Sequence, residues 1–247
     1  MKFYLIYSNQ FAVGNKPIGI ASLASVLKQN GHSFKLMDCT QFDLRHSGSD
    51  SNKIGEISLQ FKPPSNPERL PKRREVNFTQ LCDIIAADID AFKPDMIGLS
   101  ALTDDIPLGI PIMRRIRPIF PKIPMIVGGV HATVDPGGMI KEDCIDVVCV
   151  GEGEGAILDI ATAVDKKEPL DNIQNLWVKK ADGHVIKNGL RPFIADMDTL
   201  PFPDWSIYPE TAFYKPYHGR VYKYGDFEMS RGCPYNCRFC SIKSVWG

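Results

Sequence analysis

Pro94-Asp95-Met96-Ile97-Gly98-Leu99-Ser100-Ala101-Leu102-Thr103 is the stretch that decides the fold of this 247-residue chain. Met96–Ser100 is a short apolar run, as expected of a strand buried on both faces of a parallel sheet. The hydroxyl side chains of Ser100 and Thr103 follow at its carboxyl end. In an open α/β sheet this end of a strand faces the ligand. We therefore interpret the stretch as a central strand that ends at a binding site.

Similar apolar runs alternate with helical patterns on both sides of this stretch. Alternation of this kind predicts an α/β fold with a doubly wound, parallel, five-stranded sheet over residues 1–165. The other strands are expected at 2–7, 33–38, 124–127 and 146–150, and the helices at 17–30, 75–92, 106–118, 135–141 and 153–165.

The pattern changes after about residue 168. Residues 173–180 and 185–188 flank Ala181-Asp182-Gly183-His184, which indicates a hairpin. Residues 195–218 are rich in proline and aromatic residues and are interpreted as an extended linker, so that 166–225 form a hairpin and linker. A strand at 226–230 is expected to open a further unit, residues 226–247. The polar stretch 45–74 predicts no element and is expected to be an insertion or a mobile loop.

Composition excludes several functional classes. Lysine plus arginine and aspartate plus glutamate number 29 each, so the net charge gives no argument for nucleic acid or an anionic membrane as a partner. No run reaches the roughly 18 apolar residues of a membrane span. The apolar run at 2–7 is too short for a signal peptide, so the expected location is cytoplasmic.

Three of the seven cysteines are clustered in Ser230-Arg231-Gly232-Cys233-Pro234-Tyr235-Asn236-Cys237-Arg238-Phe239-Cys240. Three thiolates at the spacing C-x3-C-x2-C can hold three irons of a [4Fe–4S] cube. The fourth iron is then left open to chelate the amino and carboxylate groups of S-adenosylmethionine (SAM). The alternatives are a zinc site or a chance cluster. A closed zinc site needs four ligands, and His218 stands at a spacing that fits no common zinc module.

This motif resembles the radical SAM superfamily. The aromatic Phe239 before the last cysteine, the preceding Arg-Gly-Cys-Pro and the following serine all match it. The resemblance implies that Cys233, Cys237 and Cys240 are the metal ligands and that Phe239 packs near the adenine of SAM. It also implies that the reduced cluster cleaves SAM to methionine and a 5′-deoxyadenosyl radical.

Residues 1–165 resemble the Rossmann-like cobalamin-binding domain that precedes the barrel in one radical SAM subclass. The resemblance is carried by residues 17–20, 94–103, 127–131 and 146–154. It implies cofactor contacts from Ser100, Leu102, Thr103, Gly128, Gly129, Val130, Gly151 and Glu152. Hydroxyls can bond the benzimidazole-bearing tail, and glycines let ligand and backbone approach closely. Each feature alone has a structural alternative: a helix cap, a tight turn, or an acid at a helix N-terminus.

One departure concerns the cobalt ligand. Many cobalamin proteins carry D-x-H-x-x-G after the first strand, whereas residues 8–14 here contain no histidine. His32 follows the first helix and is badly placed for this role, and His131 is interpreted as a capping or packing residue. The sequence therefore predicts base-off binding without a histidine ligand. The lower axial position is then empty, filled by water, or faced by a side chain from residues 8–14.

These resemblances imply an enzyme that uses cobalamin, SAM and a [4Fe–4S] cluster, most commonly to methylate an unactivated carbon, although ring-forming members exist. Its partners would be a small-molecule substrate and a low-potential electron donor such as flavodoxin or ferredoxin. Residues 226–247 would be the truncated start of a partial barrel, and the 247 residues alone are expected to be inactive. Two alternatives stay open: a non-catalytic cobalamin module with a vestigial cluster loop, and a radical SAM enzyme that has lost cobalamin.

Overall fold

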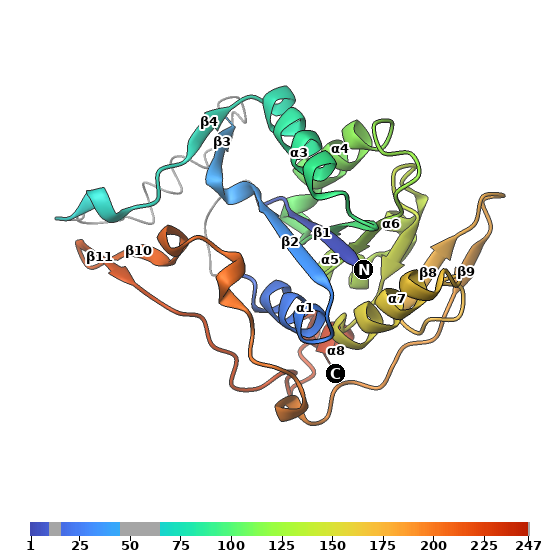
Figure 1. Ribbon diagram of the computed structural model, residues 1–247. Coiled ribbons are helices and arrows are strands. Elements are labelled where there is room, and N and C mark those ends of the chain that lie inside the picture. The colour runs from blue at the N-terminus through green and yellow to red at the C-terminus, as the bar shows by residue number, and fades with distance from the viewer. Residues whose placement is uncertain (10–15, 45–64, 247) are drawn as a thin grey trace.

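A seven-stranded sheet forms the centre of the molecule (Figure 1). The computed structural model describes residues 1–9, 16–44 and 65–246. The strand order is β2-β1-β5-β6-β7-β8-β9. The first five of these strands are parallel, whereas β8 and β9 are antiparallel to their neighbours. The bounds are β1 Lys2–Tyr7, β2 Ser33–Asp38, β5 Met96–Ser100, β6 Met125–Gly128, β7 Val147–Cys149, β8 Leu176–Lys179 and β9 Val185–Lys187.

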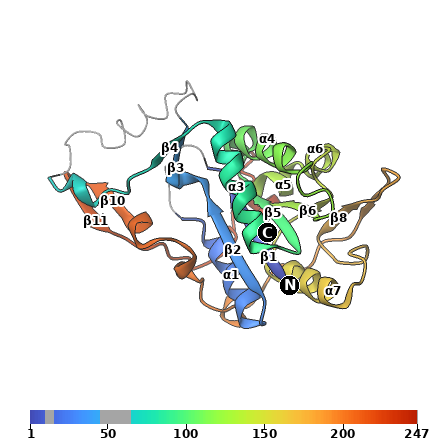
Figure 2. The same cartoon turned by 45° about the horizontal axis from the view of Figure 1, so that its top comes forward.

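Helices cover both faces of this sheet (Figures 1 and 2). One face carries α1 and α7, and the other carries α3, α4 and α6. The short helix α5 follows β6 at the carboxyl edge of the sheet. The bounds are α1 Ile18–Gln29, α3 Phe78–Phe92, α4 Ile106–Ile116, α5 Val130–Val134, α6 Pro136–Lys141 and α7 Glu154–Lys166.

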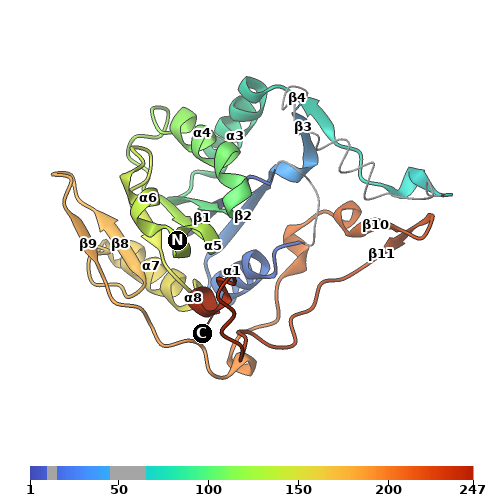
Figure 3. The same ribbon diagram turned by 180° about the vertical axis from the view of Figure 1, so that it is seen from behind.

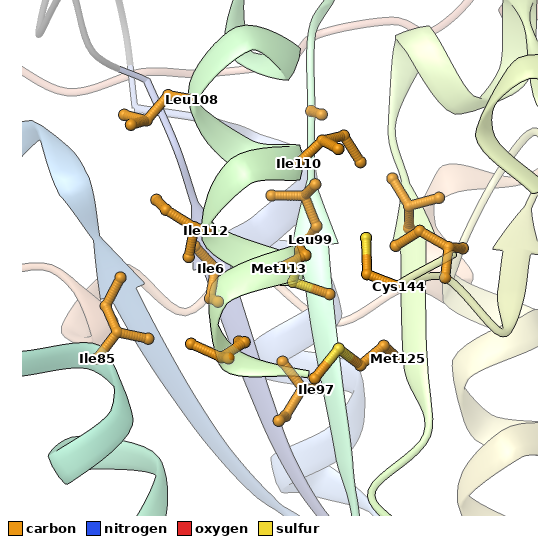
Figure 4. Close-up of a cluster of buried hydrophobic side chains, with 14 of the residues drawn as sticks. Ile6, Ile85, Ile97, Leu99, Leu108, Ile110, Ile112, Met113, Met125 and Cys144 are labelled. Atoms are coloured by element: carbon orange, nitrogen blue, oxygen red, sulfur yellow. The ribbon is translucent and has the colours of Figure 1, made fainter. Parts of the chain in front are cut away.

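Alternation along the strands divides the core between the two faces. Ile6 and Leu99 point to the face under α4, where Met113 packs against them (Figure 4). Phe3 and Leu5 point to the opposite face, toward α1 and α7. All five side chains are nearly inaccessible. Each such burial contributes about 1.5–3 kcal/mol, which explains why these strands read as unbroken apolar runs.

The expected doubly wound α/β fold is confirmed. The five predicted parallel strands and the helices between them occur in the predicted order, with bounds that differ by a few residues. The expected hairpin is also present as β8 and β9. It is not separate from the sheet, because β8 pairs with β7 and extends the five parallel strands by two antiparallel ones.

The interpretation of residues 195–218 as an extended linker is wrong. This region folds into 3₁₀ turns and an antiparallel pair: η4 Met197–Thr199, η5 Trp205–Ile207, η6 Glu210–Phe213, β10 Tyr214–Tyr217 and β11 Arg220–Lys223. The rings of Trp205, Tyr208 and Phe213 lie 6.1–6.3 Å apart between centroids. Asp204 fixes the segment to α1, because its N–H donates to the Ala21 carbonyl at 2.9 Å. The aromatic residues therefore form a small core instead of a spacer.

The expected strand at 226–230 is also wrong. The structure has no strand at residues 226–230, and a side-chain hydrogen bond holds this segment. Asp226 is buried and accepts a hydrogen bond from the Lys16 backbone N–H at 3.0 Å. The chain ends in the short helix α8, Ile242–Trp246, which packs against α5 and lies near α1 when seen from behind (Figure 3).

The polar stretch 45–74 is described only from residue 65. Residues 45–64 lie outside the described part of the chain. The remainder contains η2, Pro67–Arg69, and β4, Arg74–Val76, which pairs in parallel with β3, Phe42–Leu44. Among the described helices, none has the length and apolar character needed to cross a membrane.

Candidate functional site

A cavity of about 450 Å³ opens at the carboxyl edge of the parallel strands, between the sheet and helices α1 and α7. It spans the boundary between β1 and β5, where Tyr7 lies beside Ser100 and the strand order reverses. Open α/β sheets bind ligands at this position. Apolar side chains form most of its wall: Phe3, Leu5, Ile20, Leu23, Ile126, Ile157 and Ile160. The volume lies in the range of about 300–1,000 Å³ that is usual for organic ligands.

Glycines form the rim of this cavity. Gly129 has φ +102°, and a Cβ atom there would lie 2.8 Å from the Ala101 carbonyl oxygen. Gly151 has φ +82°. L-residues rarely adopt such backbone conformations, so both positions favour glycine. Gly128 is less constrained, because a Cβ atom there would be 3.7 Å from the Cβ atom of Cys149.

Backbone hydrogen bonds hold the rim in place. The Ala101 N–H donates to the Gly128 carbonyl at 3.1 Å, and the His131 N–H donates to the Ala101 carbonyl at 3.2 Å. The Thr133 hydroxyl accepts from the Gly151 N–H at 2.9 Å and donates to the Gly129 carbonyl at 3.0 Å. The loops after β5, β6 and β7 are thus joined to one another, and the rim is formed before any ligand arrives.

The structure brings together most of the residues expected to contact cobalamin. Six of them line the cavity: Ser100, Leu102, Gly128, Gly129, Val130 and Gly151. The other two, Thr103 and Glu152, do not line it, and neither does Phe239, which is expected beside SAM. The Thr103 hydroxyl lies 3.1 Å from Nδ1 of His131, which packs at the rim. Glu152 is buried beside the cavity, and Phe239 is 93% exposed. Their expected contacts with the cofactors stay predictions.

Polar groups lie at the carboxyl end of β1. The Ser8 hydroxyl donates to the Asp105 carbonyl at 3.1 Å, and the Asn9 side chain donates to the Tyr7 hydroxyl at 2.7 Å. Burial raises the pKa of Tyr7 to about 12 and also raises the pKa of the Asp105 carboxyl. Residues 10–15, the rest of the segment expected to face the cobalt, lie outside the described residues.

No histidine occurs among the described residues that line the cavity. His32 lies at the other edge of the sheet, where its Nδ1 is 3.1 Å from the Met1 amino group. It is therefore badly placed for the cavity, as the sequence indicates.

The seven cysteines divide into two chemical groups. Cys39, Cys82, Cys144 and Cys149 are buried. Burial raises the pKa of all four thiols, to about 11 for Cys82 and Cys144 and to about 12 for Cys149. Metal ligation needs the thiolate, so these side chains are poor ligands.

The clustered cysteines differ from the buried ones in exposure. Cys237 and Cys240 are exposed, and Cys233 is half-buried. The chain turns tightly there, with Gly232 at φ +87° and the Cys240 N–H donating to the Cys237 carbonyl at 3.1 Å. Three accessible thiols on one turn fit the ligand set of an open [4Fe–4S] cluster.

A second acidic and thiol group offers a weaker metal site. Glu142, Asp143 and Cys144 are the one set of three potential ligand atoms within 4.8 Å of one another in the described residues. Both carboxylates pair with Arg114, and Cys144 carries a thiol of raised pKa. The two carboxylates are therefore already paired with Arg114, and the thiol keeps its proton, so the three groups are poor metal ligands.

Sequence reasoning missed two residues that organise the site. Arg231, in the cysteine motif, forms ion pairs with Glu152, Glu154 and Glu228. Asn175 is buried after α7, and its side chain donates to the Glu152 carbonyl at 2.9 Å. These contacts join segments far apart in the chain, so no local pattern marks them. The positive φ of Asn175, +71°, is compatible with asparagine but does not single it out in the sequence.

Comparison with known proteins identifies the fold around this cavity. Residues 74–161, which include β5, β6, β7 and most of α7, match the model of the B12 binding domain. The chain contains a B12-binding domain. The rim glycines and the wall residues Ile126, Ile157 and Ile160 lie within the matched residues.

Curated relatives extend beyond the B12-binding domain. An uncharacterized methyltransferase of Pyrococcus horikoshii is 28% identical over 232 residues, which cover 94% of this chain and 41% of the relative. The anaerobic magnesium-protoporphyrin IX monomethyl ester cyclase of Rubrivivax gelatinosus is 31% identical over 169 residues, or 66% of this chain and 30% of the relative. The chain therefore spans less than half the length of these relatives.

Solved structures agree on the fold. The cobalamin-dependent S-adenosylmethionine radical enzyme OxsB, with aqua-cobalamin and S-adenosylmethionine bound, aligns with a TM-score of 0.55 at 17% identity. The alignment covers 83% of this chain and 24% of OxsB. The domain match and the curated relatives confirm the resemblance to B12-binding-domain-containing radical SAM proteins that is stated from the sequence, and the solved structure agrees with its fold.

Proposed function

We propose that this chain binds cobalamin at the carboxyl edge of its B12-binding domain and carries the cluster loop of a radical SAM enzyme. The cavity is the observation that carries the cobalamin proposal. Its apolar wall suits the benzimidazole of the nucleotide tail, and the corrin ring would lie over the rim. A tail bound there would keep the benzimidazole away from the cobalt, as the predicted base-off binding requires, and the described residues that line the cavity include no histidine.

The rim residues would bind the tail and exclude water from it. The apolar wall would bury the benzimidazole, and the Ser100 hydroxyl at the end of β5 would meet its polar atoms. Gly128 and Gly129 would allow the tail to pass close to the backbone. The tail's phosphate would accept hydrogen bonds from backbone N–H groups of the rim loops.

The cysteine loop would hold the second cofactor. Cys233, Cys237 and Cys240 would bind three irons of a [4Fe–4S] cluster, and SAM would bind the fourth, with Phe239 beside its adenine. When bound, the cluster and SAM supply a 5′-deoxyadenosyl radical, and methylcobalamin supplies a methyl group. A low-potential donor such as flavodoxin or ferredoxin would reduce the cluster.

Methylation of an unactivated carbon is the reaction we propose for the whole enzyme, because the Pyrococcus horikoshii relative that covers 94% of this chain is a methyltransferase by name. Ring formation is a second candidate, favoured by the 31% identity to the Rubrivivax gelatinosus cyclase. Both are proposals about a protein of which this chain spans a part. The substrate contacts would lie in a barrel that extends beyond the domain described above.

The test is an anaerobic absorbance titration of residues 1–247 with hydroxocobalamin and with methylcobalamin. We expect saturable binding of one cobalamin per chain, with a base-off spectrum. A second measurement reconstitutes the chain with iron and sulfide, and we expect about four of each per chain for a [4Fe–4S] cluster. Absence of saturable cobalamin binding would contradict the first half of the proposal, and iron without sulfide would contradict the second.

A further inference from the structure

Arg231 joins the cysteine loop to the loop between β7 and α7. Its guanidinium lies 2.9 Å from the Glu152 carboxylate, 3.0 Å from that of Glu154 and 3.2 Å from that of Glu228. The side chains of Arg231, Glu152 and Glu154 are 6, 7 and 5% exposed. Loss of Arg231 would leave the buried carboxylates of Glu152 and Glu154 uncompensated, so this is not an ordinary surface ion pair.

Other contacts hold the two carboxylates that receive Arg231. The second oxygen of Glu152 accepts the Ile194 N–H at 2.7 Å, and its backbone carbonyl accepts from the Asn175 side chain. Glu154 is the first residue of α7, where the positive helix end favours an acid. These contacts do not depend on the cysteine loop, so the acidic receptor is present before Arg231 docks on it.

The segment that Arg231 anchors also forms part of the cavity wall. Glu228, Arg231 and Val245 line the cavity together with the B12-binding domain. Val245 is 4% exposed in helix α8, which packs against α5 (Figure 3). By contrast, Met229 and Phe239 of the same segment are almost fully exposed. The segment therefore contacts the rest of the described chain at Asp226, at the Arg231 cluster and at Val245, and the last two contacts lie at the cavity.

We propose that Arg231 is a positioning residue that couples cobalamin binding to docking of the cysteine loop. This inference rests on the proposed binding of cobalamin in the cavity. One wall of the cavity exists only while the loop is docked, so cobalamin favours the docked state. By reciprocity, docking increases the affinity for cobalamin by the same factor. Cobalamin binding would therefore hold the cysteine loop, with its cluster, against the B12-binding domain.

The experiment compares Arg231→Gln with Arg238→Gln in the full 247-residue chain. Arg238 lies in the same loop and is exposed, so its variant removes the same charge without touching the receptor. Two quantities are measured: the dissociation constant for hydroxocobalamin, and hydrogen exchange of residues 226–246 with and without hydroxocobalamin. In the wild-type chain, hydroxocobalamin slows exchange in this segment. In Arg231→Gln the slowing is lost and the dissociation constant rises on the order of tenfold.

The control and conservative variants sharpen the result. Arg238→Gln keeps both properties within about twofold, and Arg231→Lys, which retains the charge but not the forked geometry, falls between the wild type and Arg231→Gln. Equal affinity and equal slowing of exchange in the wild type and Arg231→Gln would overturn the coupling. If Arg231→Gln does not fold, Glu152→Gln, which removes the charge of a receptor carboxylate that does not line the cavity, decides by the same two measurements. A wild-type chain that does not bind hydroxocobalamin would overturn the proposed function itself, whereas binding without coupling overturns this inference alone.

Discussion

The rim of the cavity and the cysteine loop would hold their cofactors by different physical means. The rim is built from backbone hydrogen bonds among Ala101, Gly128, Gly129 and Thr133 over an apolar wall. The cysteine loop is largely exposed and meets the domain through charged contacts of Arg231. A site made by the backbone is sensitive to the addition of a single Cβ atom. A site made by donor atoms is sensitive to their chemistry, and we expect mutations to separate the two.

The largest effect is expected from loss of a cluster ligand. Cys237→Ala leaves two of the three accessible thiols, so we expect reconstitution with iron and sulfide to yield no stable [4Fe–4S] absorption. Cys144→Ala removes a buried thiol of raised pKa and should reconstitute like the wild type. Iron and sulfide analysis with visible absorption measures both. A full cluster in Cys237→Ala would show that the ligand set is wrong.

The next effect separates two glycines that line the same cavity. Gly129→Ala introduces a Cβ atom 2.8 Å from the Ala101 carbonyl oxygen at φ +102°, so we expect the free energy of unfolding to fall by about 1–3 kcal/mol. In Gly19→Ala, within α1, the added Cβ atom has no neighbour within 4 Å. We expect the free energy of unfolding to rise by about 0.5–1 kcal/mol. Urea unfolding measures both values. The same sign for the two variants would contradict a strained rim at Gly129.

A neighbouring substitution should affect ligand binding and leave the fold intact. Gly128→Val places its Cβ atom in ordinary contact with Cys149, and both residues line the cavity. We expect unchanged thermal unfolding and a hydroxocobalamin affinity lower by roughly tenfold, because the added methyl groups occupy ligand space. The absorbance titration measures the affinity. Unaltered affinity would place the ligand away from β6.

The smallest effect concerns the pH dependence of stability. Burial raises the pKa of the Asp105 carboxyl, so the folded chain binds this proton more tightly than the unfolded chain. Stability should therefore decrease as the pH rises from the ordinary carboxyl pKa of about 3.9 through the raised value. Asp105→Asn keeps an oxygen acceptor for the Leu102 N–H and should remove this slope, with a change within about 1 kcal/mol. Urea unfolding between pH 4 and 7 checks it, and an unchanged slope would exclude Asp105 as the cause.

Much of the fold could be predicted because its signals are local. Apolar runs marked the five parallel strands, and the helix expected at 75–92 begins at 78 because Asn77 and Gln80 form a capping box before it. The rim glycines were found for the same reason, since they directly follow predicted strands. The contacts of the rim residues with cobalamin stay predictions, and so do the boundaries of the predicted domains.

Non-local contacts could not be predicted in this way. Trp205 and Phe213 look like linker residues until Tyr208 is seen to pack between the turns and α1. Arg231 belongs to the cysteine motif in the sequence, and its partner Glu152 lies 79 positions away, so no local pattern indicates their pairing. The pairing of β8 with β7 likewise depends on a sheet edge that no local pattern describes.

The most direct test of the account compares hydroxocobalamin with a cobinamide, which has the corrin ring but lacks the nucleotide tail. Both are titrated into residues 1–247 under anaerobic conditions, and the dissociation constants are compared. If the cavity between the sheet, α1 and α7 holds the tail, cobinamide should bind at least tenfold more weakly, and Gly128→Val should weaken hydroxocobalamin alone. Equal affinity of the wild-type chain for the two corrinoids would contradict the account, because the cavity would then contribute nothing to binding.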